Sequence, residues 1–348
     1  MSALREKLIK NSTSKYTDTL LDSKIYNKKD LIHTDVPMIN VGLSGSLNGG
    51  ITPGFTMICG KSKHFKSGFM LLLAKSFLNK YPDGMILFYD SEFGTPHSYI
   101  RSFELPLDSI VHTPITDIEQ LKFDIMQQLE GITRDDHVMI IIDSIGQLAS
   151  KKEANDAIEA NSKADMVRPK EMKSLFRLIT PHLTIKDIPL VAINHVYQEM
   201  KLYGKQVVSG GTGVYLAADN IWIIGREQEK DNKDEVIGYD FIINVEKSRY
   251  IKEKTKIPIS ITYKGGINKW SGLFEQAING GFVNKSKDGK SFSYSLVDNK
   301  TGEVSSEKYT EATIRNDKLV WEKLLKNKDF VKYIEDLYKI ESGQIVED

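Results

Sequence analysis

Short apolar segments recur along the first two thirds of the chain, separated by longer stretches with helical spacing, and this alternation constrains the fold most. Five segments have the length and composition of strands: 55–60 (FTMICG), 85–92 (MILFYDSE), 138–143 (VMIIID), 188–194 (IPLVAIN) and 220–225 (NIWIIG). Three of them are nearly continuous apolar runs, which is typical of strands covered on both faces. Helix-like stretches lie between them, at about 66–81, 96–104, 116–131 and 169–186. The pattern predicts an α/β fold with a mostly parallel central sheet and helices on both sides.

The two ends of the chain depart from this alternation. Residues 1–34 are polar and rich in lysine, with only a weak helical pattern, so we expect an N-terminal arm. Segments 239–249 and 256–264 resemble a hairpin added to the edge of the sheet. The stretch 271–348 mixes short helices and strands, which is typical of a small α+β lobe. We therefore expect an arm, a core at 35–270 and a C-terminal lobe.

Composition excludes several classes of protein. A chain of 348 residues can bury a substantial core without disulfides, and its one cysteine, Cys59, lies in an apolar run where a buried, reduced thiol is expected. We find no signal-peptide pattern and no run of 18 apolar residues, so we expect no membrane span and a cytoplasmic protein. Lys and Arg together number 47, as do Asp and Glu. Nucleic-acid binding would therefore depend on basic residues concentrated on particular loops.

The segment 60–67, GKSKHFKS, follows the first strand candidate and leads directly into a helix candidate. A phosphate-binding loop has the pattern G-x-x-x-x-G-K-[ST] in this context, and the match departs at Phe65, where glycine is usual. In such a loop Lys66 reaches the terminal phosphates, Ser67 binds Mg²⁺, and the helix N-terminus presents backbone N–H groups to the phosphate oxygens. The other interpretation is a basic surface turn. The nucleotide contacts expected from the loop are Gly60, Lys61, Ser62, Lys63, His64, Phe65, Lys66, Ser67 and Gly68.

Phe65 does not rule out a working loop. The residue before the lysine tends to have a positive φ, as part of the concave run of N–H groups that holds an anion. A non-glycine residue costs about 1–2 kcal/mol in this conformation, which a stable domain with a bound triphosphate can offset. We therefore expect the ring to pack beside the loop while the backbone N–H groups point inward.

Three further strand candidates end in polar residues, and ligands of such sheets bind at the carboxyl ends of the strands. Asp143 ends an apolar run and would support Mg²⁺ beside the loop. Glu92 follows another strand and could orient a water molecule for attack on a γ-phosphate. Asn194 and His195 end a third, where a polar side chain can sense whether a γ-phosphate is present. Each feature is weak alone, but together they predict a site for ATP and Mg²⁺.

With these motifs the sequence resembles RecA-family recombinases, and most closely their UvsX-type branch in T4-like bacteriophages. The resemblance runs from the lead-in SGSLNGGITPG to GGINKWSGLFEQAINGGFV, and a phosphate loop with Phe before the Lys is itself a mark of the phage branch. It implies a RecA-like P-loop ATPase core with an N-terminal oligomerisation arm, in the cytoplasm of an infected bacterial host. It also implies a DNA-dependent ATPase that forms helical filaments on single-stranded DNA, with ATP at the subunit interface. Double-stranded DNA, a single-strand-binding protein and a loading mediator would be its partners in strand exchange, repair and recombination-dependent replication.

The resemblance also assigns roles to residues. It implies that Lys66 is a phosphate ligand and that Ser67 and Asp143 are Mg²⁺ ligands. It also implies that Glu92 is the catalytic base. Tyr99 matches the position whose ring packs on the adenine, and His195 occupies the switch position, at which bacterial RecA has Gln. Lys247 and Arg249 match the pair that reaches the ATP of the neighbouring subunit. Strand alternation also places these two cations on one side, although a solvated edge strand would show the same pattern.

Candidates for DNA contact come from two polar loops, 149–170 and 196–213. Both begin at strand ends near the predicted nucleotide, so the nucleotide state could order them. The following helix candidate, 169–186, adds basic side chains on one face, which would hold backbone phosphates with little base preference. The expected DNA-binding residues are Lys170, Lys173, Arg177, Lys201, Lys205, Gly210 and Gly211. Composition alone also allows both loops to be disordered surface, whereas the resemblance implies that they line the filament axis.

Two other functions fit part of the sequence. A ring helicase motor would share the core fold, but the sequence has no obvious arginine finger acting within its own subunit. A non-hydrolysing structural or mediator paralogue would bind DNA or a recombinase and use the nucleotide only as a ligand. Phe65 keeps that reading open, whereas Glu92 and Asp143 argue against it. Residues 1–35 have too little apolar periodicity to sit inside their own domain, so we expect them to pack on an adjacent protomer.

Overall fold

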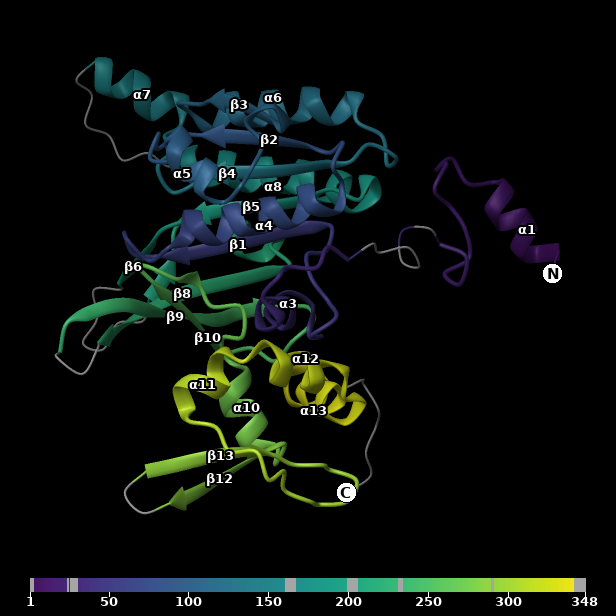
Figure 1. The fold of residues 1–348 in the computed structure, drawn as a ribbon. Helices are drawn as coiled ribbons and strands as arrows, with labels where there is room; N and C mark the ends of the chain where they lie inside the picture. Colours follow the sequence, from purple (N-terminus) through teal and green to yellow (C-terminus); the bar gives the residue numbers. More distant parts are fainter. Residues whose placement is uncertain are drawn as a thin grey trace.

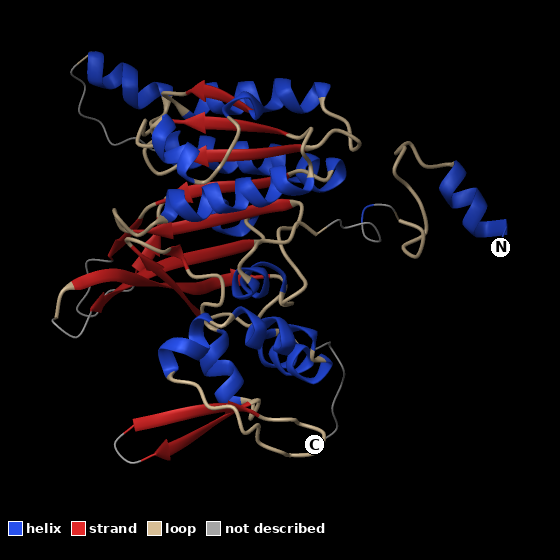
Figure 2. Ribbon diagram, in the orientation of Figure 1, coloured by secondary structure: helices blue, strands red, loops and turns tan. Residues whose placement is uncertain are grey.

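A nine-stranded sheet forms the centre of the molecule (Figures 1 and 2). The computed structural model describes residues 3–23, 25, 31–159, 167–198, 206–230, 234–288 and 291–340. The strand order is β11-β10-β9-β8-β1-β5-β4-β2-β3, parallel from β8 to β3 and antiparallel from β8 to β11. The strands are β1 (Gly54–Gly60), β2 (Met85–Asp90), β3 (Ile110–Pro114), β4 (Val138–Asp143), β5 (Pro189–Asn194), β8 (Asn220–Lys230), β9 (Val236–Ser248), β10 (Lys256–Thr262) and β11 (Gly266–Ile267). The predicted α/β fold with a mostly parallel sheet is confirmed.

Helices cover both faces of the sheet, because successive side chains of a strand point to opposite faces. In β1, Ile58 packs in the same apolar cluster as Phe69 of α4 (Lys66–Lys80). Its neighbours Met57 and Cys59 pack on the other face, with Ile179 of α8 (Val167–Lys186). Cys59 is a free, fully buried thiol, as expected. The helices of this part are α3 (Pro37–Ser44), α4 (Lys66–Lys80), α5 (His97–Ser102), η1 (Leu107–Ser109), α6 (Ile118–Gly131), α7 (Lys151–Ile158), α8 (Val167–Lys186) and α9 (Gly211–Ala217).

The structure contains elements that the sequence pattern did not predict. The edge strand β3 was missed because its five residues are only half-buried or exposed, so no apolar run marks them. The first candidate DNA loop was expected to be irregular, but part of it forms α7, whose N-terminus is capped by Ser150. A separate two-stranded ribbon of β6 (Val196–Gln198) and β7 (Gln206–Val208) lies within the second.

A C-terminal lobe packs on the core, whereas the N-terminal helix does not (Figure 1). The lobe consists of α10 (Leu273–Asn279), β12 (Val283–Asp288), β13 (Ser291–Leu296), α11 (Glu311–Asn316), α12 (Lys318–Lys326) and α13 (Lys328–Tyr338). Its Trp321 and Phe330 are fully buried in the cluster that also contains side chains of α3 and α4. Helix α1 (Ala3–Lys10) buries none of its residues. None of the helices in the described ranges combines the length and apolar character that crossing a membrane requires.

Candidate nucleotide-binding site

A cavity of about 340 Å³ opens where β1, β2, β4 and β5 end. Its lining residues are Ser62, Lys63, His64, Phe65, Lys66, Ser67, Gly68, Glu92, Gly94, Tyr99, Asp143, His195 and Phe241. All of them except Gly94 and Phe241 were named from the sequence. They converge because parallel neighbouring strands finish at the same edge of a sheet. Gly60 and Lys61 belong to the same loop but do not line the cavity.

Phe65 precedes α4 in the left-handed conformation, with φ 57° and ψ 23°. Lys63 also has a positive φ, of 62°, so the loop holds two non-glycine residues in a conformation that costs about 1–2 kcal/mol each. The Phe65 ring packs edge-on against Phe69, with ring centroids 5.4 Å apart, and lies 5.3 Å from the ring of Phe241. Burying a ring of this size stabilises the fold by about 1.5–3 kcal/mol. The aromatic cluster therefore offsets much of the strain in the loop.

Two further contacts fix the loop. A Cβ atom on Gly68 would lie 2.4 Å from the Phe65 ring, so the ring occupies space that any side chain at position 68 would need. The ring of His64 is anchored to the sheet, because its Nδ1 lies 2.7 Å from the carbonyl oxygen of Ile224 in β8. Burial lowers the pKa of His64, so its ring tends toward the neutral form. The loop thus has a defined shape without glycine at position 65.

Lys66 lies at the start of α4 and is 8% exposed. Its Nζ donates a hydrogen bond to the carbonyl oxygen of Lys61 at 3.0 Å. Burial lowers the pKa of Lys66, while the nearby Glu92 and Asp143 carboxylates oppose that shift. A partly desolvated ammonium group at a helix N-terminus is a strong partner for phosphate oxygens. The position therefore suits the terminal phosphates of a nucleotide.

Asp143, at the end of β4, has the surroundings of a carboxylate that supports a metal ion. Ser67 Oγ donates to its Oδ2 at 2.8 Å, and Thr95 Oγ1 lies 3.4 Å from the same atom. Its Oδ1 is buried without a hydrogen-bond partner among the described residues. Burying an unpaired carboxylate oxygen costs free energy unless a cation binds it. Burial is the main cause that raises the pKa of Asp143 to about 6, and the charges of Glu92 and Asp90 add to it.

These residues fit Mg²⁺ bound together with a nucleotide. Across the described parts of the chain, no three His, Cys, Asp or Glu side chains are grouped so that they could hold a metal ion by themselves. Mg²⁺ commonly takes one or two protein ligands and completes its shell with phosphate oxygens and water. Ser67 and Asp143 would supply the protein ligands at this position.

Glu92 follows β2 and meets His195, 103 positions further along the chain. The Oε1 atom of Glu92 lies 2.8 Å from Nε2 of His195 and accepts a hydrogen bond from Ser144 Oγ. The bond with His195 is the main cause that lowers the pKa of Glu92, although burial opposes it. Glu92 is therefore a carboxylate at neutral pH, able to accept a proton. Ser144 was not named from the sequence, although it follows Asp143 directly.

His195 also connects the cavity to the second candidate DNA loop. Asn194 is fully buried, and its Nδ2 donates to the carbonyl oxygen of Ser209 at 2.8 Å. The Ser209 N–H in turn donates to the carbonyl oxygen of His195 at 3.0 Å. Gly210 and Gly211 follow with φ angles of 94° and 78°, in the region that favours glycine. A displacement of His195 would therefore reach the base of this loop directly.

The other candidates for DNA contact are divided between described and undescribed parts of the chain. Lys170, Lys173 and Arg177 are exposed on α8, and their spacing of three and four residues places them on one face of the helix. Lys201 and Lys205 lie outside the described residues.

Lys247 and Arg249 do not line the cavity of their own protomer. The Nζ of Lys247 donates to three carbonyl oxygens at the C-terminal end of α9, at distances of 2.7 to 3.0 Å. The Nε of Arg249 lies 2.6 Å from Asp219 Oδ1. The two cations therefore lie close together, and both have partners within their own chain.

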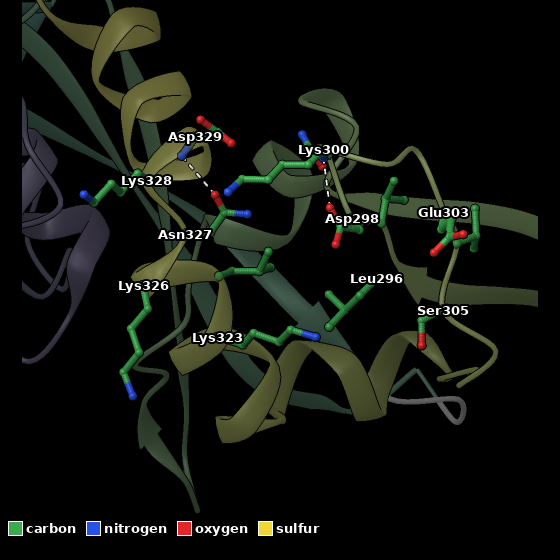
Figure 3. Close-up of a pocket in the computed structure, with 14 residues that line it drawn as sticks. Leu296, Asp298, Lys300, Glu303, Ser305, Lys323, Lys326, Asn327, Lys328 and Asp329 are labelled. Atoms are coloured by element: carbon green, nitrogen blue, oxygen red, sulfur yellow. Dashed lines mark hydrogen bonds between the residues drawn. The ribbon is translucent and has the colours of Figure 1, made fainter.

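A larger cavity, of about 660 Å³, lies in the C-terminal lobe (Figure 3). The charged side chains around it are Asp298, Lys300, Glu303, Lys323, Lys326, Lys328 and Asp329. Because both signs of charge line this cavity, the electrostatics do not select clearly for an anion or a cation. No residue of the loop 60–67 contributes to it, so it is separate from the site at the strand ends.

The raised pKa of Asp143 predicts a pH-dependent stability for the nucleotide-free protein. The folded carboxyl group, with a pKa of about 6, binds its proton more tightly than the unfolded one, with its ordinary value of 3.8. The folded state therefore loses stability as the pH rises between these two values. When the pH is raised from 5.0 to 7.5, we expect the free energy of unfolding of Asp143→Asn to rise by about 1–2 kcal/mol relative to that of the original protein. Urea unfolding at both pH values measures this difference; the same relative stability at both would contradict it.

Known proteins match the chain both over its whole length and over parts of it. A family model for the C-terminal domain of the bacteriophage T4 recombination and repair protein matches residues 270–334. The recombination and repair protein of Enterobacteria phage T4 is 44% identical over 351 residues, covering 100% of this chain and 89% of that protein. RecA of Ruegeria pomeroyi is 23% identical over 214 residues, covering 61% of this chain and 59% of RecA. RecA of Parvibaculum lavamentivorans is 24% identical over 215 residues, covering 61% and 56%.

Proposed function

This chain belongs to the family of the phage T4 recombination and repair protein and is a recombinase of phage recombination and repair, and from that premise we propose that it hydrolyses ATP in response to single-stranded DNA. The resemblance to RecA-family recombinases that the motifs predicted is confirmed, and the core is RecA-like. We propose its division into an arm at 1–34, an ATPase core at 35–270 and a C-terminal lobe at 271–348.

The ATPase proposal rests on one observation: a phosphate loop and two carboxyl groups line the same cavity. The pKa of one, Glu92, is lowered, and that of the other, Asp143, is raised. Glu92 is ionised and lies at the surface of the cavity, where it can orient a water molecule and accept its proton. Lys66 holds the terminal phosphates and stabilises the charge that develops on them during transfer to water. Tyr99 lines the same cavity and offers its ring to the adenine.

Mg²⁺ is the cofactor that this site suits. Ser67 and Asp143 would hold it on the protein side, where Oδ1 of Asp143 is buried without a hydrogen-bond partner among the described residues. When bound, Mg²⁺ neutralises charge on the phosphate oxygens.

Contact with DNA is proposed for α8 and for the second polar loop, 196–213. Lys170, Lys173 and Arg177 present cations on one exposed helix face, which suits phosphates of a strand bound without base preference. The hydrogen bonds among Asn194, His195 and Ser209 support coupling between this surface and the nucleotide. Lys201, Lys205, Gly210 and Gly211 of that loop are the further proposed contacts, the two lysines lying outside the described residues.

We further propose that ATP lies between protomers of a helical filament. Lys247 and Arg249 lie away from the cavity of their own chain, which supports a contact with the phosphates of a neighbour. In that arrangement the filament pairs single-stranded with double-stranded DNA and exchanges strands. A single-strand-binding protein and a loading mediator are proposed as its further partners, in the cytoplasm of an infected host.

The experiment that tests this function measures ATP hydrolysis with and without unstructured single-stranded DNA, together with negative-stain imaging. Strong stimulation and helical filaments are the expected result. ATP binding without stimulated turnover would favour the mediator-type paralogue and implicate Phe65. Turnover without filaments would instead favour a motor of another kind.

Neutralising the exposed cations of α8 tests the DNA surface. We expect the triple variant K170A/K173A/R177A to bind single-stranded DNA more weakly and to reduce the slope of log affinity against log salt by about 2, at roughly 0.7 per lost phosphate contact. The triple variant K318A/K326A/K332A, with exposed lysines of the lobe, is the charge-matched control. Affinity measured by fluorescence anisotropy at several salt concentrations distinguishes them; equal losses in both variants would count against a specific role for α8.

A further inference from the structure

The loop that carries Glu92 is held from behind by Asp90, the last residue of β2. Asp90 is 4% exposed, and its Oδ1 accepts hydrogen bonds from the backbone N–H groups of Glu92 and Phe93, at 3.1 and 2.7 Å. Phe93 has a positive φ of 53° and is 62% exposed. An exposed ring contributes little packing to hold a residue in that conformation. The Glu92 N–H also lies 3.3 Å from the carbonyl oxygen of Asp143, to which the Ser91 N–H donates at 2.9 Å. At Phe93 the hydrogen bond to Asp90 is the backbone N–H contact found among the described residues, so Asp90 holds the second half of the turn and shares the first half with β4.

The other oxygen of Asp90 faces the edge of the sheet. Its Oδ2 lies 3.3 Å from Nε2 of His112, on the neighbouring strand β3. The His112 ring is also packed against Phe88, with ring centroids 5.3 Å apart. The side chain of His112 is 46% exposed and that of Asp90 only 5%. A series of contacts thus runs from His112 on the edge strand, through Asp90, to the backbone at Glu92.

The loop after β2 separates two cavities. Glu92 lines the nucleotide cavity. Asp90, Phe93 and His112 instead line a different cavity, of about 290 Å³, on the other side of the loop. None of these three residues lines the nucleotide cavity. An effect of Asp90 on hydrolysis would therefore not come from direct contact with ATP.

We propose that Asp90, with His112 as its outer partner, is a positioning residue that sets the orientation of Glu92 for hydrolysis. The inference rests on the proposed function, in which Glu92 acts on the attacking water. By fixing the backbone at 92 and 93, Asp90 lets the contacts of Glu92 with Ser144 and His195 form in one geometry. Misplacing a reacting group by about 1 Å can cost roughly 100-fold in rate.

The charge of Asp90 offers a competing explanation. Its carboxylate contributes to the raised pKa of Asp143, and a change at position 90 could therefore act on the metal-binding carboxylate instead. Asparagine separates the two explanations, because Asp90→Asn keeps the oxygen that accepts both N–H groups and removes the charge. A positioning role predicts that Asp90→Asn retains ATP hydrolysis and that Asp90→Ala loses most of it.

The test combines D90A and D90N with E92Q in full-length protein, and measures kcat and KM for ATP with single-stranded DNA and the Kd of a fluorescent ATP analogue. We expect D90A to lower kcat by about 10-fold or more while KM and Kd stay within about 2-fold, and D90N to stay within about 3-fold of the original kcat. In the E92Q background D90A should change kcat by less than about 2-fold, because no base remains to be misplaced.

Each other outcome has a defined meaning. D90A could lower kcat equally in the protein with Glu92 and in E92Q, or D90N could lower kcat as much as D90A. Either result would overturn the positioning role while leaving the ATPase proposal intact. An E92Q protein with unchanged kcat would refute the role of Glu92 itself and this inference with it. Should D90A fail to fold, H112A decides instead, since His112 is half exposed. A loss of about 3-fold in kcat that H112A causes in the protein with Glu92, but not in E92Q, supports the inference. An equal loss in both proteins, or no loss in either, overturns it.

Discussion

Lys66→Ala is expected to lower ATP turnover in the presence of single-stranded DNA by about 100-fold or more, because it removes the main cation facing the terminal phosphates. The Nζ of Lys66 is anchored only to the carbonyl oxygen of Lys61 among the hydrogen bonds found in the described residues. Its pKa is already lowered by burial, so removing it should cost the nucleotide-free fold little. Steady-state hydrolysis and thermal unfolding without nucleotide measure the two effects separately.

Lys75→Ala provides the matched control, since Lys75 lies on the same helix and pairs with Glu104 at the surface, away from the cavity. This variant should retain its turnover. Residual activity near that of the original protein in Lys66→Ala would show that the site has been placed wrongly. A large loss of thermal stability in Lys66→Ala would mean that folding, and not phosphate binding, explains the lost turnover.

Deleting residues 1–30 is expected to abolish filaments and leave a folded core. Helix α1 buries none of its residues, and three leucines of the arm are exposed, Leu4 and Leu8 at 63% each and Leu21 at 84%. Exposed apolar side chains on a segment that does not pack on its own domain are typical of a contact with another chain. The deletion spares Ile32, which pairs with Ile51 on the core. Negative-stain imaging with single-stranded DNA and an ATP analogue measures the loss.

A triple substitution distinguishes the contribution of the leucine side chains from that of the rest of the arm. Replacing Leu4, Leu8 and Leu21 with serine should shorten filaments strongly while the thermal unfolding of the core stays unchanged, because each of these residues is at least 63% exposed within the protomer. Filaments of unchanged length after the deletion would refute a polymerising role for the arm. Loss of filaments in the deletion but not in the serine variant would assign that role to the backbone or the polar residues.

The main elements of the sheet could be predicted because each is a local pattern. The apolar run at 138–143 was expected as a strand and is β4, and the helix expected at 66–81 is α4, Lys66–Lys80. Strand β3 was missed because an edge strand with exposed side chains leaves no apolar run to detect. Helix α7 was missed because its sequence, KKEANDAI, is mostly polar and buries none of its residues, and composition alone does not distinguish such a short helix from a loop.

The candidate site was predictable to the extent that its residues stand at the ends of strands. Glu92, Asp143 and His195 were named on that basis, and the structure brings all three to one cavity. Ser144 and Phe241 were not named, because nothing in their local sequence distinguishes them from ordinary neighbours. Their place at the site follows from contacts between segments far apart in the chain.

The sequence by itself determined which residues could do chemistry, because the order of strands and helices and the residues at their ends depend on local periodicity and on the direction of the chain. Only the tertiary structure decided how those residues act on one another. The ring of Phe65 is accommodated by Phe69 and Phe241, and the acidity of Glu92 depends on a contact with His195, 103 positions away. Such effects arise from distances and burial, which exist only once separate segments have packed together.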